Sequence, residues 1–159
     1  KEYSYPTSLL EATVSVNERQ RLVVIKKLQE ELKILKGRTV GLLGLSFKPD
    51  TDDLRDAPAI TIAYQLLKMG ASVKAFDPVA NERCEQLHPN LEITYCDSAL
   101  TLAQDCDAVV LVTEWALFRN LDWKGLGKVM RWPLVIDGRN VLSEQDVVDA
   151  GMTYRGIGH

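Results

Sequence analysis

The stretch GLSFKPDTDDLRDAPA, residues 44–59, concentrates charge directly after an apolar run. Lys48 can neutralise a phosphate as a mobile point charge. Arg55 offers a planar fork that suits phosphate or carboxylate. Four aspartates, at positions 50, 52, 53 and 56, are expected to balance these cations, and Asp56 is also expected to cap the helix that follows. The stretch is therefore the first candidate for a binding site.

The aspartates of this stretch do not predict a metal site. A calcium loop requires a Gly and a Glu at fixed positions, and the stretch has neither there. Residue types alone leave two interpretations open: a phosphate-binding loop, or a solvated loop that caps a helix.

The glycines of this region form only part of a dinucleotide fingerprint. Gly41 and Gly44 give G-x-x-G, whereas the Rossmann loop has G-x-G-x-x-G directly before its helix. About a dozen residues separate Gly44 from the helix expected at Pro58. The acidic residue that would bind a ribose is expected about 20 residues on, but Asp77 lies 33 residues past Gly44. The pattern predicts a Rossmann-like fold with a broken NAD signature.

A second candidate loop lies in VIDGRNVL, residues 135–142. Gly138 allows a sharp turn after the buried strand. Arg139 is then expected to point over the sheet edge into the same crevice as Lys48. The sequence therefore predicts that cations from two strand ends converge on one ligand.

Catalytic side chains do not form an evident pattern. There is no G-x-S-x-G, and the histidines are His88 and His159. Cys106 lies between Asp105 and Asp107, which disfavours a thiolate, and we expect all three cysteines to be structural: Cys84, Cys96 and Cys106. In TEWALF, residues 113–118, Trp115 and Phe118 can stack on a base, but we expect them in the core. The prediction is that this chain contributes no catalytic residue.

The order of apolar segments predicts an α/β fold. Residues 8–36 read as one long helix that ends at Gly37, packed on its own domain or paired with a second copy. Short apolar strands then alternate with helices, which predicts a Rossmann-like parallel sheet with helices on both faces. Expected strands are 38–45, 72–78, 91–96, 107–113, 132–138 and 153–158, and expected helices are 58–70, 80–88, 98–106 and 143–151. The predicted division is a helical segment 1–37 and a domain 38–159.

Composition excludes several classes of protein. The net charge of −3 argues against a nucleic-acid-binding protein. No apolar run approaches the roughly 20 residues that cross a membrane. An odd number of cysteines without C-x-x-C fits a reduced compartment, so the expected location is cytoplasmic.

Four segments in a fixed order carry a family resemblance: GLSFKPDTDDLRDAPA, FDP at 76–78, TEWALF and VIDGRN. Together they resemble the carboxyl-terminal, UDP-binding domain of the UDP-glucose/GDP-mannose dehydrogenase family. VSVNERQR, residues 14–21, is similar to the start of the long central helix of that family. The resemblance implies a homodimer through residues 8–36. It also implies a fragment of an enzyme that oxidises UDP-glucose to UDP-glucuronate with two NAD.

The resemblance also implies roles for individual residues. Phe47, mainly through its backbone, and Lys48, through its charge, match positions at the UDP-sugar. Arg139 matches the substrate-contacting Arg of a D-G-R motif, and Arg55 matches an Arg that reaches NAD. NAD itself is expected to bind mainly to an amino-terminal domain that this chain lacks. Because the glycine-rich segment with the family's catalytic Cys is also absent, we expect the isolated chain to be inactive.

Three alternatives stay open at this point. One is a self-contained NAD-binding regulatory module, which would bind NAD by itself. Another is a flavodoxin-like interaction domain without affinity for nucleotides. The third is a fragment of a related dehydrogenase that acts on GDP-mannose or a UDP-N-acetylhexosamine.

Overall fold

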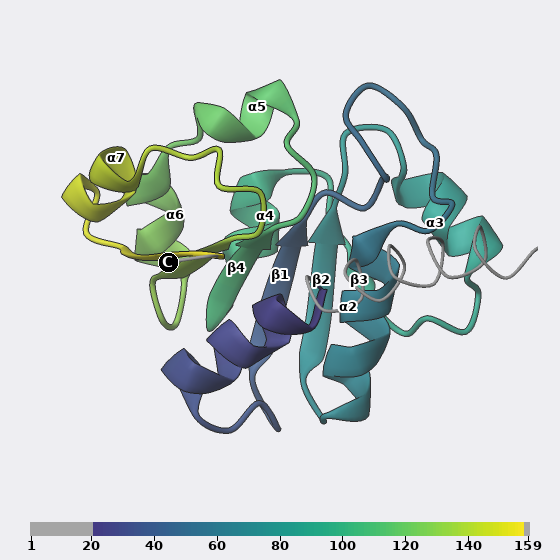
Figure 1. The fold of residues 1–159 in the computed structure, drawn as a ribbon, viewed down its shortest axis with the longest axis horizontal. Helices are drawn as coiled ribbons and strands as arrows, with labels where there is room; N and C mark the ends of the chain where they lie inside the picture. The colour runs from purple at the N-terminus through teal and green to yellow at the C-terminus, as the bar shows by residue number, and fades with distance from the viewer. Residues whose placement is uncertain (1–20, 158–159) are drawn as a thin grey trace, which may run out of the picture.

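The computed structural model describes residues 21–157 and builds one parallel sheet from them (Figure 1). The six strands lie in the order β3-β2-β1-β4-β5-β6, which is the order of a doubly wound fold. Their bounds are β1 Thr39–Leu43, β2 Ser72–Phe76, β3 Thr94–Tyr95, β4 Ala108–Leu111, β5 Leu134–Asp137 and β6 Thr153–Gly156. The predicted parallel sheet is confirmed, with β6 at one edge.

Helices cover both faces of this sheet. Along β4, Ala108 and Val110 face one core and Val109 and Leu111 the other, as the pleat of a strand requires. The first core includes the helical segment 21–32 and the second includes Phe118. The helices are α2 Pro58–Lys68, α3 Asn81–Leu87, α4 Ala99–Ala103, α5 Ala116–Arg119, α6 Trp123–Val129 and α7 Glu144–Asp149. The α/β class with helices on both faces is therefore confirmed.

Two helices between β4 and β5 were not expected. One is the single turn of α5, and the other is α6, which contains Gly125 and Gly127. Glycine disfavours a helix interior, so α6 gives a weak pattern. Its start is nevertheless marked, because the Asp122 carboxylate accepts a hydrogen bond from the Gly125 backbone at 3.1 Å.

The amino-terminal helix ends earlier than the sequence indicates. Its described part covers residues 21–32 and stops where Lys33 takes a left-handed φ of 69°. The expected end at residue 36 was wrong, because Gly37 (φ 81°) belongs to the turn before β1. Val24 and Leu28 of this helix are buried in the core of the same domain. Residues 8–20 of the predicted dimer helix lie outside the described residues. The division at residue 37 stays a prediction.

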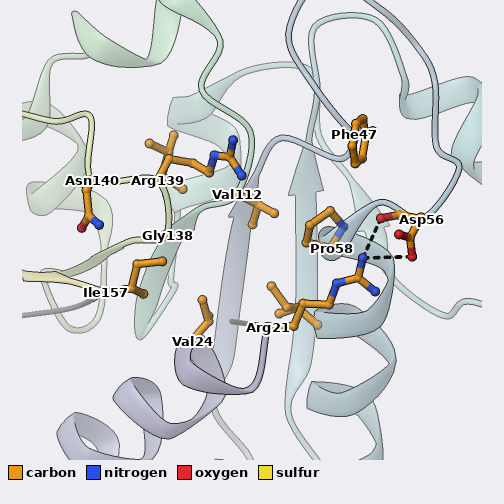
Figure 2. A pocket seen from close by; sticks show the side chains of 12 residues that line it. Arg21, Val24, Phe47, Asp56, Pro58, Val112, Gly138, Arg139, Asn140 and Ile157 are labelled. Atoms are coloured by element: carbon orange, nitrogen blue, oxygen red, sulfur yellow. Dashed lines mark hydrogen bonds and ion pairs between the residues drawn. The ribbon is translucent and has the colours of Figure 1, made fainter. Parts of the chain in front are cut away.

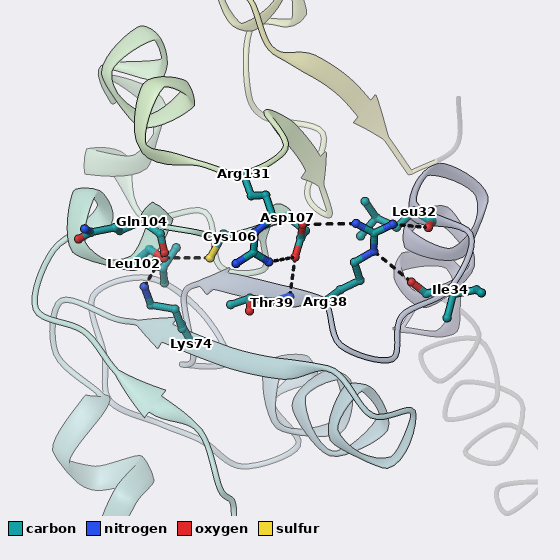
Figure 3. A network of polar contacts seen from close by, with 10 residues as sticks. All are labelled: Leu32, Ile34, Arg38, Thr39, Lys74, Leu102, Gln104, Cys106, Asp107 and Arg131. Atoms are coloured by element: carbon teal, nitrogen blue, oxygen red, sulfur yellow. Dashed lines mark hydrogen bonds and ion pairs between the residues drawn. The ribbon is translucent and has the colours of Figure 1, made fainter.

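Charged side chains tie this helix end to the amino ends of the strands (Figure 3). The fully buried Asp107 carboxylate accepts hydrogen bonds from the Thr39 backbone at 2.8 Å and from Arg131 at 3.1 Å. Arg38 lies 3.5 Å from the other oxygen of Asp107 and donates to the carbonyl of Leu32. Two arginines and one aspartate therefore join helix, β1 and β4.

Candidate functional site

A pocket of about 440 Å³ opens at the carboxyl ends of β4 and β5 (Figure 2). This is the edge at which parallel sheets bind ligands. Its wall comes from the helix 21–32, the start of α2 and the loops after β1 and β5. Its lining includes Arg21, Phe47, Asp56, Gly138, Arg139 and Asn140.

Arg139 supplies a cation to this pocket. Its backbone N–H donates to Asp137 at 3.1 Å, and its Nε pairs with Glu114. Figure 2 shows the guanidinium reaching over the pocket toward Val112. Gly138 brings the backbone close beneath it, because a Cβ there would lie 2.6 Å from the Leu111 carbonyl oxygen. Of the guanidinium nitrogens of Arg139, only Nε has a hydrogen-bond partner among the described residues, so the two terminal nitrogens can bind a ligand.

Phe47 lies across the pocket from Arg139 (Figure 2). Its ring is half-exposed and its backbone N–H donates to the Asp53 carbonyl at 2.7 Å. Lys48 is exposed next to it but does not line the pocket, and it forms no hydrogen bond or ion pair within residues 21–157. The structure thus brings Phe47 and Arg139 together and leaves Lys48 near the rim.

Arg55 lies outside this pocket, beside a shallow hollow of about 470 Å³ formed with α3. Its side chain is 91% exposed and binds both carboxylate oxygens of Asp53, at 3.0 and 2.9 Å. These hydrogen bonds lower the pKa of Asp53 to about 2. The expectation that an aspartate of this loop holds Arg55 is confirmed.

Asp56 does not cap α2, so that prediction was wrong. The N-cap is Ala57, and no side chain caps the helix there. Asp56 has a left-handed φ of 55°, which turns its carboxylate toward the amino-terminal helix. Arg21 donates to the Asp56 carbonyl at 2.6 Å and to its carboxylate at 3.1 Å. Arg21 was missed as a pocket residue, since nothing local in the sequence links it to Asp56.

Asp77 is buried where β2 ends, with 3% of its surface exposed. One oxygen accepts the backbone N–H groups of Leu45 and Ser46, at 2.8 and 2.9 Å. The other accepts those of Val79 and Ala80, at 2.9 and 2.8 Å. Burial alone would raise the pKa of Asp77, but these four donors outweigh it and lower the pKa. Asp77 therefore joins the loops after β1 and β2 and does not face a ligand.

The cysteines and aromatic residues lie where the sequence places them. All three cysteines are buried, and burial raises each thiol pKa, for Cys106 to about 12 with smaller contributions from its acidic neighbours. Trp115 and Phe118 are in the core, as predicted. Residues 21–157 contain no cluster of His, Cys, Asp or Glu that could bind a metal ion. None of their helices is both long and apolar enough to span a bilayer.

The sequence profile of the UDP-glucose/GDP-mannose dehydrogenase family, UDP binding domain, matches residues 41–144. The chain belongs to this family. The match includes the loops after β1, β2, β4 and β5, and it confirms the resemblance carried by the motifs.

Several UDP-glucose dehydrogenases are similar to almost the whole chain. The UDP-glucose 6-dehydrogenase of Pseudomonas aeruginosa is 39% identical over an alignment of 163 positions, which covers 99% of this chain and 36% of that protein. The UDP-glucose 6-dehydrogenase TuaD of Bacillus subtilis is 35% identical over 158 residues, or 99% and 34%. A solved UDP-glucose dehydrogenase of Pyrobaculum islandicum superposes with a TM-score of 0.79 at 32% identity, over 98% of this chain and 34% of that one. The chain thus spans about a third of the length of these relatives.

Proposed function

We propose that this chain is the UDP-sugar-binding part of an NAD-dependent UDP-glucose 6-dehydrogenase, which oxidises UDP-glucose to UDP-glucuronate. The observation that carries the proposal is the position of Phe47 and Arg139 on one pocket at the carboxyl edge of the sheet. That edge lies within the region that matches a UDP-binding domain. A volume of about 440 Å³ falls in the range of small-molecule sites.

Three residues of the site have distinct roles in this proposal. Arg139 offers its terminal nitrogens to the diphosphate, while Glu114 holds its Nε and orients the planar group. Lys48, exposed near the rim, adds a mobile positive charge. Phe47 contributes its backbone carbonyl, because its N–H already donates to the Asp53 carbonyl. Together they favour a dianionic ligand over a neutral one.

The proposal assigns the redox chemistry to the rest of the enzyme. Arg55, held by Asp53, reaches NAD that is bound mainly by an amino-terminal domain. The three cysteines are buried with raised pKa values, so none is suited to be the nucleophile. A homodimer through residues 8–36 completes the proposal.

We expect no NADH formation when the isolated 159-residue chain is mixed with UDP-glucose and NAD, and reproducible turnover would contradict the fragment assignment.

Calorimetry with UDP and with NAD tests the binding site. Hydrogen bonds to charged groups contribute about 1.5–3 kcal/mol, so Lys48→Ala or Arg139→Ala should each weaken UDP binding roughly 10- to 150-fold. Arg131→Ala is the matched control, because Arg131 is a half-exposed arginine at the opposite end of the sheet. If NAD binds tightly and neither substitution affects UDP, the chain is an NAD-binding module instead.

A further inference from the structure

The loop after β1 has the position of a dinucleotide-binding loop, but its backbone donors are already occupied. In Rossmann folds such N–H groups bind the pyrophosphate. Here Gly44 donates to the Phe76 carbonyl at 2.8 Å. Leu45 and Ser46 donate to Asp77 at 2.8 and 2.9 Å. The groups that would bind a phosphate therefore bind a carboxylate of the same chain.

The environment of the Asp77 carboxylate is that of a bound anion. It accepts two backbone N–H groups on each oxygen, and the Ser46 hydroxyl donates a further hydrogen bond at 3.0 Å. The indole N–H of Trp115 lies 3.3 Å from the same oxygen. Within the described part of the chain, no Lys or Arg forms an ion pair with it. Backbone and neutral donors alone stabilise this buried charge, as in the anion-binding nests of other folds.

Ser46 connects the Asp77 carboxylate to the residues beside the pocket. Its carbonyl accepts the Thr113 hydroxyl at 2.7 Å, so the residue is held from the β4 side as well. Phe47 and Lys48 follow directly in the chain. The conformation of Leu45 and Ser46 thus determines where the next two residues lie relative to Arg139.

We propose that Asp77 is a positioning residue for the UDP-sugar. Its carboxylate occupies the place of the pyrophosphate in the loop after β1, which fixes Phe47 and Lys48 beside the neighbouring pocket and excludes a dinucleotide from this loop. The positioning role rests on the proposed function of the pocket, whereas occupation of the loop does not.

The first test compares two buried carboxylates at opposite ends of the sheet. Asp77→Ala should weaken UDP binding at least about tenfold. Asp107→Ala removes an equally buried aspartate from the network in Figure 3, and UDP affinity should change less than about twofold. Thermal unfolding of both variants checks whether each is folded at the temperature of the titration. Equal losses of affinity would overturn the proposal, because they would reflect stability alone.

The second test replaces the missing Asp77 carboxylate with one from solution. Sodium acetate supplies a small carboxylate, and in Asp77→Ala it should shift the backbone amide resonances of Leu45 and Ser46 and restore part of the UDP affinity. The wild-type amides should respond neither to acetate nor to NAD. Absence of an acetate effect in the folded variant, or NAD-induced shifts in the wild type, would overturn the proposal.

A milder variant and a separate readout keep the outcomes distinct. If Asp77→Ala does not fold, Asp77→Asn keeps the shape but turns an amide N–H₂ toward one pair of backbone donors, and UDP should again bind at least about tenfold more weakly. Unchanged affinity would contradict the positioning role. If the wild type itself does not bind UDP, the proposed function fails, while the acetate shifts still decide whether Asp77 occupies the loop.

Discussion

The two ends of the sheet use buried aspartates in opposite ways. At the amino end, Asp107 is paired with Arg38 and Arg131. At the carboxyl end, Asp77 is stabilised by backbone N–H groups. Asp137 is likewise stabilised by the Leu142 N–H at 2.8 Å and the Tyr154 hydroxyl at 2.9 Å.

The difference shows how a fold can keep cations available for a ligand. An arginine that neutralises a buried carboxylate is no longer free to bind an anion. Neutral donors stabilise the buried Asp77 and Asp137 of the carboxyl end without using a cation. Arg139 and Lys48 therefore remain at that end with unused donors, within the part of the chain that the structure describes. The ion pairs of the amino end stabilise the fold, whereas the cations of the carboxyl end are available to an anionic ligand.

The largest expected effect is on stability, and it distinguishes alanine substitutions at two glycines that both have a positive φ. Gly44, at the carboxyl end, has φ 101°, and a Cβ there would lie 2.4 Å from Thr113. Gly37, near the amino end, has φ 81°, and a Cβ there meets nothing within 4 Å. Gly44→Ala should therefore lower the free energy of unfolding by about 3–5 kcal/mol, through strain and overpacking, and Gly37→Ala by only ~1–2 kcal/mol. Urea denaturation measures both, and similar losses would show that the loop after β1 is not tightly packed.

A smaller effect on stability is expected when one donor to a buried aspartate is removed, either a neutral hydroxyl or a cation. Tyr154→Phe removes the hydroxyl that binds the buried Asp137, which should lower the free energy of unfolding by about 1.5–3 kcal/mol. Arg131→Met should cost less than about 1 kcal/mol, because Arg131 is half-exposed and Asp107 keeps its other donors. Urea denaturation at neutral pH tests both. A larger loss for Arg131→Met would reverse the contrast between the two ends.

The same tyrosine predicts a dependence on pH. Burial, followed by the hydrogen bond to Asp137, raises the pKa of Tyr154 above its ordinary value of 10.0. The folded state thus favours the protonated phenol, so this contribution to stability is complete below pH 10 and is lost as the pH rises further. The stability of the wild type should fall above pH 10 more steeply than that of Tyr154→Phe. Parallel curves would contradict this assignment.

The smallest effect concerns the exposed ion pair of the loop after β1. Arg55→Ala should return the pKa of Asp53 from about 2 toward 3.8, because the Arg55 hydrogen bonds lower it. In the wild type, the folded state favours the ionised carboxylate, so its small contribution is present above pH 4 and is lost as the pH falls toward 2. Carboxyl carbon shifts during an acid titration measure the pKa in both proteins. An unchanged pKa in the variant would assign the shift to another group.

Much of the fold follows from the sequence because strands of a parallel sheet are almost continuously apolar. The run at 107–113 shows this, since its central residues form β4. Helix ends are harder to predict. The end at Leu32 depends on a left-handed Lys33, which is not marked by a glycine. The helix α6 contains two glycines and was missed, although Asp122 marks its start.

The site was predictable where it depends on strand ends and missed where it depends on distant partners. Phe47 and Arg139 follow β1 and β5, so topology alone brings them to one edge. The contact of Arg21 with Asp56 joins residues 35 positions apart, and neither neighbourhood has a motif for it. Asp77 looks like a candidate for a ribose, and only the fold shows that its oxygens face inward.

The strand order has a consequence for how the chain is assembled during synthesis. In the sheet, Val40 of β1 pairs with Val73 of β2 on one side and with Ala108 of β4 on the other. A nascent chain can therefore form the β1–β2 pair early, but β1 keeps an unpaired edge until β4 has left the ribosome. Pairing of residues so far apart in sequence closes a long loop, which slows folding. A pause in translation between these strands would prolong exposure of a central strand that is apolar from Val40 to Leu43.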